Sequence, residues 1–551
     1  MQSSNKEMKS AALEARGLWA VALLILILAT VVRLNDINLP YFWTDEAFSA
    51  LISVQSPAAI LFHTGHDVHP PLYYLLLHIW IQVFGDSVLA LRTMSAVSGV
   101  LAVALGMWLM CLIGTARQAL LAGLFMALLP ISVRYSQEVR MYSLEAVWLL
   151  GATIALVYWL RSARDRYLLG YILLLISALL THYLAILCVG AHFIYLVALR
   201  FQGDKTLHVL SRARIWGAWL ITAMACVPWL MVLADEVIVH NEAFRAGGEI
   251  FWIPDPTMYT LPSAIWRFLT LRSHTELFTP VYLLLPVLVV MSSLWVVFAD
   301  RSRLRVGQLV FLYSFFPVLA AFLVSFKLSI FVERYMAFAA IGLMMLLAMT
   351  VERLVSRNPI SGGAVVVVIL GLECLGLSIV YTQQDDLDDP RNATLHPLDQ
   401  VVASINERSI PGDSIIVNNG YWYYSVAYYS RLGLQPLLYE PPWDNSHANR
   451  PNGYGSSTLI YRDRDRLFLE DLSTLPASVK RVWWVSSGPS SGFDKRIPES
   501  WQCLLVEDAG EMKLHLYAIQ APDSARRGVT DNRCPRSGEN GLALDRQSET
   551  P

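Results

Sequence analysis

The chain has 551 residues, of which 55% are hydrophobic and 16% are charged, and its formal net charge is -2. Soluble proteins usually carry about 25% charged residues, so this composition excludes an ordinary soluble enzyme. The near-neutral charge gives no reason to expect a nucleic-acid partner. Apolar residues occur in repeated runs of roughly 20, the length that crosses a bilayer. The sequence therefore predicts a polytopic membrane protein whose fold is mainly α.

The first apolar run covers residues 17–32 and follows a basic segment that contains Lys6, Lys9 and Arg16. No small-residue cleavage site follows the run, so we interpret it as a retained span and not as a signal peptide. Basic segments stay on the cytoplasmic side of a membrane. We therefore expect a cytoplasmic N-terminus and a first span that runs outward.

Two adjacent carboxylates, Asp45 and Glu46, come directly after this span, in the aromatic stretch Tyr41–Leu51. A carboxylate in such a setting, just outside the hydrocarbon core, loses water and can act as a base. The alternative is structural: a helix N-terminus with Thr44 as the N-cap and both acids in the first turn.

The next apolar segment, Pro70–Phe84, is too short to cross a bilayer in a simple way. A helix of this length covers about 22 Å, whereas the hydrocarbon core is about 30 Å thick. The segment also contains His78 and Gln82. We predict a helix that lies in the outer interface.

With that segment left out of the count, the later basic loops all fall on the cytoplasmic side, as the positive-inside rule requires. The sequence then predicts eleven spans and an exported C-terminal part. The predicted spans are residues 17–32, 90–113, 120–133, 141–160, 167–180, 184–199, 215–233, 280–298, 306–326, 335–350 and 363–381.

The composition changes after Tyr381, where an acidic, turn-rich linker begins. We predict three parts: a transmembrane domain (1–381), a periplasmic α/β domain (382–520) and a disordered tail (521–551). The α/β domain is expected to contain helices at Leu398–Arg408 and Tyr424–Leu432, strands at Ser414–Val417 and Arg481–Val485, and an antiparallel pair formed by Cys503–Glu507 and Lys513–Ile519.

This topology gathers ionisable residues at the outer ends of the spans. Such groups cost about 2.5–3.5 kcal/mol at membrane depth, so they are expected to pair, line a cavity or bind a ligand. The expected set is Asp45, Glu46, His63, His66, Asp67, His69, Arg92, Arg134, Glu138, Arg140, His182, Lys327, Glu333 and Arg334. Arginine suits a phosphate and a carboxylate base suits activation of a hydroxyl, which together indicate sugar transfer from a lipid-linked phosphate.

Two local alternatives concern parts of this set. His63, His66 and His69 are reminiscent of a zinc site, but their spacing is loose and Asp67 is the only nearby acid, so a divalent metal is not favoured. We expect His69 to anchor the interfacial helix or to contact the donor phosphate. The RYSQEVR turn, residues 134–140, is alternatively a turn that satisfies its own charges.

Other functional classes make different demands on the chain. A lipid-linked sugar flippase or transporter needs charges along a route through the bundle, yet the inner halves of the spans are nearly free of charge, with Glu373 the main exception. A polysaccharide polymerase would also use arginine-rich outer loops. A non-catalytic assembly protein would explain the spans but not the clustered acids. No Gly-rich phosphate loop appears, which argues against a soluble nucleotide-sugar donor.

Several short motifs resemble bacterial membrane glycosyltransferases of the protein O-mannosyltransferase and lipid A aminoarabinose transferase superfamily. They are WTDEAFSA, DVHPPLYYLLLHIWIQVFG, the arginine at position 92, SQEVRMYSLE, FWIPDP and VERYMAF. The resemblance covers roughly residues 17–381. It implies a GT-C fold, a location in the bacterial inner membrane, a polyprenyl-phosphate sugar donor, and a protein, lipid A or glycan acceptor.

The resemblance also implies roles for individual residues. Asp45 matches the catalytic aspartate, with Glu46 beside it, and Arg92 matches an arginine that binds the donor phosphate. Arg334 and Tyr335 match an Arg-Tyr pair near a late span. The implied mechanism inverts the anomeric centre, with Asp45 as the base.

Two further matches are looser. Glu138, with Arg140, is the nearest match to a second acidic residue of the family. His69 stands where the aminoarabinose transferases have a lysine before the Pro-Pro pair. The predicted site has catalytic Asp45 and Glu46 and no metal, and its predicted donor-binding residues are His69, Arg92, Arg134, Glu138, Arg140, His182, Lys327, Arg334 and Tyr335.

Overall fold

The computed structural model describes residues 2–67, 69–201, 213–239, 253–387, 395–430, 435–440, 455–461, 463–487 and 497–519. The chain forms two compact units. The helical unit comprises Met1–Asn38 and Ile52–Asp389, and the C-terminal unit comprises Leu39–Leu51 and Pro390–Pro551. The predicted disordered tail and the first two residues of FWIPDP lie outside the described residues.

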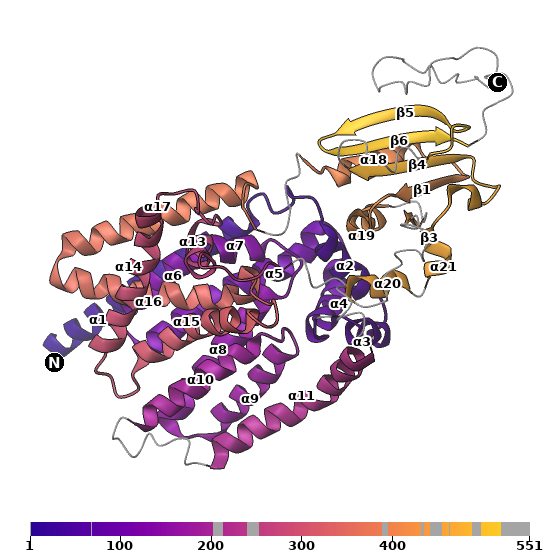
Figure 1. Ribbon diagram of the computed structural model, residues 1–551. Coiled ribbons are helices and arrows are strands. Elements are labelled where there is room, and N and C mark those ends of the chain that lie inside the picture. Colours follow the sequence, from indigo (N-terminus) through magenta and orange to yellow (C-terminus); the bar gives the residue numbers. More distant parts are fainter. Residues whose placement is uncertain are drawn as a thin grey trace. The chain divides into compact units, whose positions relative to one another are not determined.

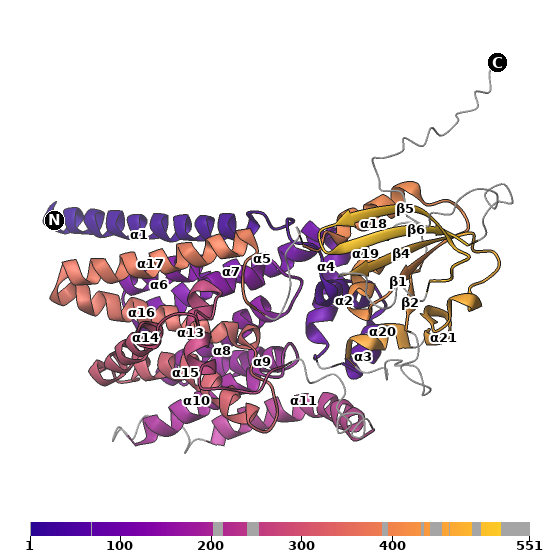
Figure 2. The same ribbon diagram turned by 45° about the horizontal axis from the view of Figure 1, so that its top comes forward.

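The helical unit is built almost entirely of helices (Figures 1 and 2). Its elements are α1 (Gln2–Leu34), α3 (Pro57–Gly65), α4 (Leu72–Phe84), α5 (Val88–Ile113), α6 (Ala116–Leu128), α7 (Pro130–Ser136), α8 (Tyr142–Ser162), α9 (Asp165–Leu179), α10 (Ala185–Arg200), α11 (Ala213–Val239), α13 (Thr260–Thr270), α14 (Thr279–Ala299), α15 (Val306–Ser325), the 3₁₀ helix η4 (Glu333–Met336), α16 (Ala337–Arg357) and α17 (Pro359–Thr382).

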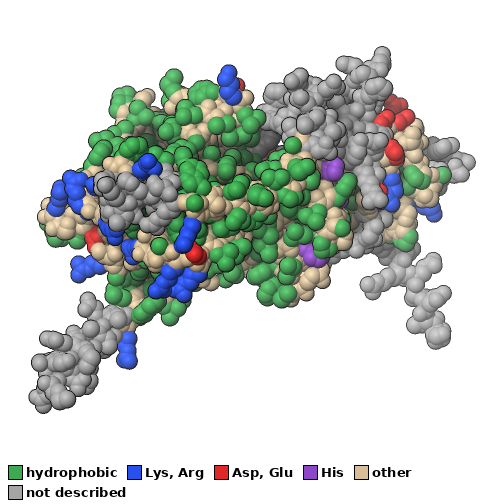
Figure 3. Space-filling view, turned by 90° about the horizontal axis from the view of Figure 1, so that it is seen from below, with side chains coloured by type: hydrophobic (Ala, Val, Ile, Leu, Met, Phe, Trp, Pro, Cys, Tyr) green, Lys and Arg blue, Asp and Glu red, His purple; other side chains and the backbone are tan. Residues whose placement is uncertain are grey.

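Eight of the described helices are long and apolar enough to cross a membrane, and hydrophobic side chains cover much of the face of this unit in Figure 3. The multi-pass membrane fold is thereby confirmed, but the count of eleven spans is not. The predicted span 120–133 falls on α6 and α7, which meet at a 57° bend. The predicted spans 167–180 and 184–199 correspond to α9 and α10, which have only 15 and 16 residues.

The segment predicted to be an interfacial helix is α4, which has 13 residues. Two side chains near the middle of its sequence anchor it. The Nδ1 of His78 lies 2.8 Å from the carbonyl oxygen of Ser53, and the indole N–H of Trp80 donates to the carbonyl of Ala90 at 2.7 Å. Its length agrees with the prediction that it is shorter than a span, and its place in the interface stays a prediction.

The bend between α6 and α7 is held by a fully buried arginine from α1, Arg33. Pro130 has no N–H, so the carbonyl of Met126 loses its partner within the helix. The guanidinium of Arg33 donates to four groups of the bent pair: the carbonyls of Met126 (3.2 Å) and Ala127 (2.9 Å) and the hydroxyls of Ser132 (3.1 Å) and Ser136 (3.2 Å). The arginine thus replaces the helix hydrogen bonding that the bend interrupts.

We expect Arg33→Met to destabilise the protein by about 2–4 kcal/mol, because several buried acceptors lose their donor at once. Arg33→Lys should recover only part of this loss, since an ammonium cannot span acceptors on both sides of the bend. Thermal unfolding of the purified protein measures the effect. Thr30→Val, one turn earlier on the exposed side of α1, is the matched control. Equal midpoints for wild type and Arg33→Met would contradict the clamp.

The C-terminal unit contains a six-stranded sheet in the order β3-β2-β1-β4-β6-β5. Its elements are most of α2 (Thr44–Ser53), α18 (Leu398–Arg408), β1 (Asp413–Val417), α19 (Gly420–Tyr429), β2 (Leu437–Tyr439), η5 (Gly455–Ser457), α20 (Thr458–Tyr461), α21 (Arg464–Leu467), β3 (Phe468–Leu469), η6 (Leu472–Thr474), β4 (Arg481–Ser487), β5 (Gln502–Ala509) and β6 (Met512–Ala518). The strands β1–β4 are parallel, and β6 is antiparallel to β4 and β5.

The predicted antiparallel pair is confirmed as β5 and β6, and the predicted helix Leu398–Arg408 is confirmed as α18. The next predicted helix begins four residues earlier than expected, at Gly420. Asn419 causes this early start, because its side-chain oxygen accepts the N–H of Tyr421 and caps the helix. The short strands β2 and β3 were not predicted.

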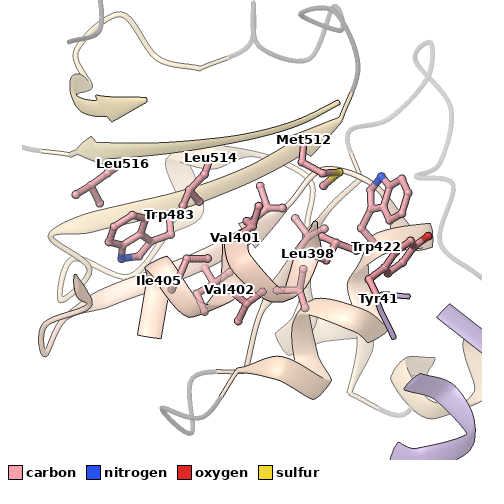
Figure 4. Packing of buried hydrophobic residues seen from close by; sticks show 14 of the residues in the cluster. Tyr41, Leu398, Val401, Val402, Ile405, Trp422, Trp483, Met512, Leu514 and Leu516 are labelled. Carbon is pink, nitrogen blue, oxygen red and sulfur yellow. The ribbon is translucent and has the colours of Figure 1, made fainter. Parts of the chain in front are cut away.

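The two faces of the sheet have separate cores. On one face, α18 and α19 pack over the strands, and Trp422, Val402 and Trp483 lie in this core. On the other face, a second core of buried side chains surrounds Trp484. Tyr41 and Trp43 also belong to the first core, where they are 1% and 4% exposed. Figure 4 shows Tyr41 beside Trp422. The aromatic segment that follows α1 is therefore part of the C-terminal unit.

Candidate active site

His69 lies immediately before the Pro-Pro pair that precedes α4, and it is buried against two charged side chains. Its Nδ1 is 3.3 Å from a carboxylate oxygen of Asp67, and its Nε2 is 3.1 Å from a guanidinium nitrogen of Arg140. Because arginine can only donate, Nε2 must accept, and the ring proton resides on Nδ1, where it points to Asp67. His69 is thus a neutral link in the chain Arg140–His69–Asp67.

Burial lowers the pKa of His69, and the nearby Arg140 lowers it further. The hydrogen bond and charge of Asp67 act in the opposite direction without reversing the shift, while His182 adds to the lowering. The folded protein therefore keeps His69 neutral below the pH at which a free histidine takes up a proton. This neutrality permits the hydrogen bond from Arg140.

Aromatic and acidic residues from several elements extend this series of contacting side chains. The ring of His182, in the turn between α9 and α10, lies 6.2 Å from the ring of His69 and 5.1 Å from that of Tyr335. Tyr142, at the start of α8, stands 5.9 Å from His182 and contacts Arg140 through its ring face. We call His69, Arg140, Tyr142, Glu145, His182 and Tyr335 the His69–His182 cluster.

Glu145 was not predicted as a site residue, although it follows the SQEVRMYSL stretch directly. Its carboxylate is 1% exposed and lies 3.4 Å from Nδ1 of His182, longer than an ordinary hydrogen bond. A buried carboxylate is costly unless it is well paired. The signal available in the sequence was an acid in the first turn of an apolar helix, which also fits a simple helix-dipole role.

A second ionic group surrounds Arg134. The guanidinium forms ion pairs with Glu138, one turn later, and with Asp385, at 3.2 Å, and all three side chains are buried or nearly so. Tyr135 links this group to the cluster, because its ring lies 5.2 Å from that of Tyr142. Arg134 therefore has two carboxylate partners. One of them, Asp385, lies outside the 134–140 turn, so this turn does more than satisfy its own charges.

Asp386, the next residue, ties the same segment to two other elements. Arg267 of α13 donates to Asp386 at 3.0 Å and pairs with Glu333 at 2.6 Å. Burial lowers the pKa of Arg267, but these two carboxylates raise it by more, so the guanidinium is firmly charged. Arg267, Asp385 and Asp386 were not predicted, because Asp385 and Asp386 read as parts of an acidic linker.

The remaining predicted donor-site residues are placed differently. Arg92 is fully buried in α5 and donates to the carbonyl of Ile37 at 2.7 Å. Arg334 is buried in η4, and its guanidinium lies 5.6 Å from the ring centre of Tyr335. Lys327 is exposed after α15, and within the described part of the chain no polar contact joins its side chain to the cluster.

The two predicted catalytic acids belong to the C-terminal unit. α2 begins at Thr44, so Asp45 and Glu46 stand in its first turn, as the structural alternative requires. Glu46 is fully buried, whereas Asp45 remains partly exposed. The hydroxyl of Thr44 donates to the carbonyl of Tyr421. A place in the first turn does not conflict with use of Asp45 as a base.

The three histidines considered for a metal do not act together. His66 contacts the carbonyl of Phe62 through Nδ1 at 2.8 Å, and the ring of His63 also packs on Phe62. Across the described ranges, no three side chains of His, Cys, Asp or Glu form a group that could hold a metal ion. Whether the reaction needs a metal stays a prediction.

Residues 68–232, which run from the loop before α4 into α11, match the family model described as dolichyl-phosphate-mannose-protein mannosyltransferase. The fold matches the crystal structure of ArnT from Cupriavidus metallidurans in the apo state, with a TM-score of 0.61, 14% identity and coverage of 93% of this chain and 100% of that one. The predicted resemblance is confirmed. No functionally curated protein matches the chain in sequence.

Two further solved structures share the fold. ArnT from Cupriavidus metallidurans bound to undecaprenyl phosphate gives a TM-score of 0.58 at 14% identity, covering 91% of this chain and 99% of that one. The archaeal oligosaccharyltransferase AglB from Archaeoglobus fulgidus, in complex with an inhibitory peptide and a dolichol-phosphate, gives 0.51 at 12% identity, covering 86% and 69%. The chain therefore has the predicted GT-C fold over nearly its whole length.

The lowered pKa of His69 predicts a specific dependence of stability on pH. The unfolded chain protonates this histidine near pH 6.5, while the folded chain resists protonation, so stability falls as the pH drops below about 6.5. His69→Gln keeps an acceptor for Arg140 but takes up no proton. Between pH 7 and pH 5 we expect the free energy of unfolding of wild type to fall more steeply than that of the variant, by up to about 1.4 kcal/mol per pH unit, which thermal unfolding shows as a steeper fall of the midpoint temperature. Parallel profiles would contradict the neutral state of His69.

Glu145→Gln should raise thermal stability while it lowers activity. The variant removes a buried charge that lacks a short hydrogen bond, which favours folding, but it also loosens the orientation of His182. We expect a higher thermal midpoint together with about a tenfold loss of turnover. The exposed pair His274–Glu276, at 3.3 Å, supplies the control Glu276→Gln, which should change neither quantity. A Glu145→Gln protein with lower stability and normal turnover would show a purely structural role.

Proposed function

We propose that this protein is a membrane glycosyltransferase that moves a sugar from a polyprenyl-phosphate donor to a periplasmic or membrane acceptor, such as a protein, lipid A or a glycan. The observation that carries the proposal is the shared fold with ArnT, one form of which is bound to undecaprenyl phosphate. The match of residues 68–232 to a mannosyltransferase family model supports the same reaction class.

The His69–His182 cluster supplies groups suited to the donor phosphate. Arg140 offers a planar set of N–H donors, and His182 adds a ring nitrogen beside Tyr335. Neutral His69 orients Arg140 without adding a positive charge of its own. Arg134 has two carboxylate partners, so we assign it, with Glu138, to support of the cluster and not to direct phosphate binding. Arg92 and Arg334 remain candidates for the phosphate on the strength of the family resemblance.

The proposed reaction is a single displacement with inversion. The acceptor hydroxyl or amine gives its proton to Asp45 as its oxygen or nitrogen attacks the anomeric carbon of the sugar. The bond from that carbon to the phosphate oxygen breaks, and its electron pair leaves with the lipid phosphate. Guanidinium groups stabilise the charge that grows on the phosphate. The role of Asp45 rests on the family resemblance, and Glu46 is assigned as its structural neighbour because it is fully buried.

The orientation in the membrane is part of the proposal. Lys and Arg side chains gather toward one end of the helical unit in Figure 3, which supports a cytoplasmic face at that end. We place the N-terminus in the cytoplasm and the C-terminal unit in the periplasm of a bacterial inner membrane.

Asp45→Asn should leave expression and thermal stability unchanged and reduce sugar transfer by at least about a thousandfold, because the amide cannot accept the acceptor proton. The assay follows radiolabelled sugar from undecaprenyl phosphate-linked sugars, mannose and aminoarabinose among them, into a membrane fraction. Asp36→Asn is the matched control, since Asp36 is exposed and its positive φ suits asparagine.

The outcomes separate the competing functions. Transfer that survives in purified Asp45→Asn would refute Asp45 as the base. Movement of intact lipid-linked sugar across proteoliposomes without cleavage would instead identify a flippase. Growth of a labelled polymer would identify a polymerase that uses the same fold.

A further inference from the structure

The segment that carries the two acids is anchored to one helix of the C-terminal unit. The backbone N–H of Phe42 donates to the hydroxyl of Tyr429 at 2.9 Å, and the hydroxyl of Thr44 donates to the carbonyl of Tyr421. Both partners lie on α19. Asp45 follows Thr44 directly, so the last fixed point before the carboxylate is a hydrogen bond to this helix.

Aromatic rings reinforce these two hydrogen bonds. The rings of Phe42 and Tyr428 lie 4.3 Å apart at an angle of 30°, and Phe48 meets Tyr424 edge-on at 5.8 Å. Tyr41 lies 6.2 Å from the ring of Trp422. Ring contacts thus occur both before and after Asp45, so α19 fixes the acid-bearing turn from two sides.

The sequence of α19 explains how one short helix makes so many contacts. Its ten residues, GYWYYSVAYY, include six aromatic side chains, and no face of such a helix is free of rings. Aromatic pairs contribute beyond their buried area, and a tyrosine hydroxyl adds a polar contact to the same ring. Trp422 and Val426 insert into the core of the sheet, which holds the helix itself in place.

We propose that α19 positions the base-bearing segment, with Tyr428 and Tyr429 as positioning residues that act on Asp45 through Phe42. This gives the C-terminal unit a defined part in the reaction: it holds the segment in which the proton acceptor lies. The inference rests on the proposed function for its catalytic consequence, while the anchoring itself is independent of that function.

The test uses the full-length protein in lipid nanodiscs and four variants. Tyr429→Phe removes the hydroxyl that accepts the Phe42 N–H. Tyr428→Leu removes the ring beside Phe42, and Tyr428→Phe restores it. Tyr423→Phe is the matched control on the same helix, because the hydroxyl of Tyr423 hydrogen-bonds to Gln435 and not to the acid-bearing segment.

The first measurement is backbone hydrogen exchange in peptides that cover residues 39–51. Tyr429→Phe and Tyr428→Leu should raise the exchange rate of this segment several-fold, while Tyr428→Phe and Tyr423→Phe should leave it at the wild-type rate. Unchanged exchange in both Tyr429→Phe and Tyr428→Leu would overturn the anchoring, whatever the protein catalyses.

The second measurement is sugar transfer with the labelled lipid that wild type uses. Tyr429→Phe and Tyr428→Leu should lower kcat by about three- to tenfold with the donor KM unchanged, and Tyr428→Phe should restore kcat. Binding of undecaprenyl phosphate should stay as in wild type for all four variants. Faster exchange with normal kcat would overturn the positioning role. If sugar transfer persists in all four variants and also in Asp45→Asn, the result would instead overturn the assignment of Asp45 as the base.

A double-mutant cycle sharpens the result. If Phe42 and Tyr428 act on Asp45 through their mutual contact, then Phe42→Leu combined with Tyr428→Leu should lower kcat little more than either single change. Multiplicative effects of the two substitutions would show that the rings act separately and would overturn the proposed route through Phe42.

Discussion

The constraint on which this structure depends is the cost of placing charge at the ends of apolar helices. Five arginines of the helical unit, Arg33, Arg92, Arg134, Arg140 and Arg334, are at most 6% exposed. Each needs acceptors that replace water, and the chain supplies them in different ways. Arg33 donates to carbonyls and hydroxyls on both sides of a proline bend, Arg134 pairs with two carboxylates, and Arg140 donates to a neutral histidine.

Arg134 and Arg140 illustrate the difference. The charge of Arg134 is balanced by Glu138 and Asp385, so a phosphate would have to compete with two carboxylates that are already in place. Arg140 donates to His69, whose lowered pKa keeps it uncharged. A hydrogen bond to a neutral ring orients a guanidinium without cancelling its charge. Two arginines six residues apart in one stretch thus have different neighbours, carboxylates beside Arg134 and a neutral imidazole beside Arg140.

The fold class and much of the C-terminal unit followed from local patterns in the sequence. Apolar runs of bilayer length predicted the long helices, and alternation predicted β5 and β6. The span count did not follow, because α9 and α10 are shorter than a bilayer and α6 and α7 meet at a bend beside Pro130. Length and hydropathy show whether a run is apolar, not whether its helix stays straight. The hydrogen bonds that stabilise the bend come from Arg33, roughly a hundred residues away in the chain.

The residues that the sequence did not reveal share one property: their partners are remote. Asp385 and Asp386 look like linker residues until Arg134 and Arg267 are seen beside them. Glu145 has the sequence context of a helix-dipole acid, and only the turn that carries His182 gives it another meaning.

The segment around Asp45 also depends on remote partners, although the sequence singled out its residues. The chemistry proposed for it was suggested by two acids among aromatic residues, but its place in the fold was not visible in the sequence, because the partners of Phe42 and Thr44 lie more than 370 residues later. A motif near the start of a membrane domain would be expected to belong to that domain. Its grouping with the C-terminal unit instead means that substitutions in the sheet-containing unit can reach the segment that carries the proposed base. Under the proposed function, the aromatic residues of a single helix in this unit would act on the reaction without any change in the residues proposed to bind the donor.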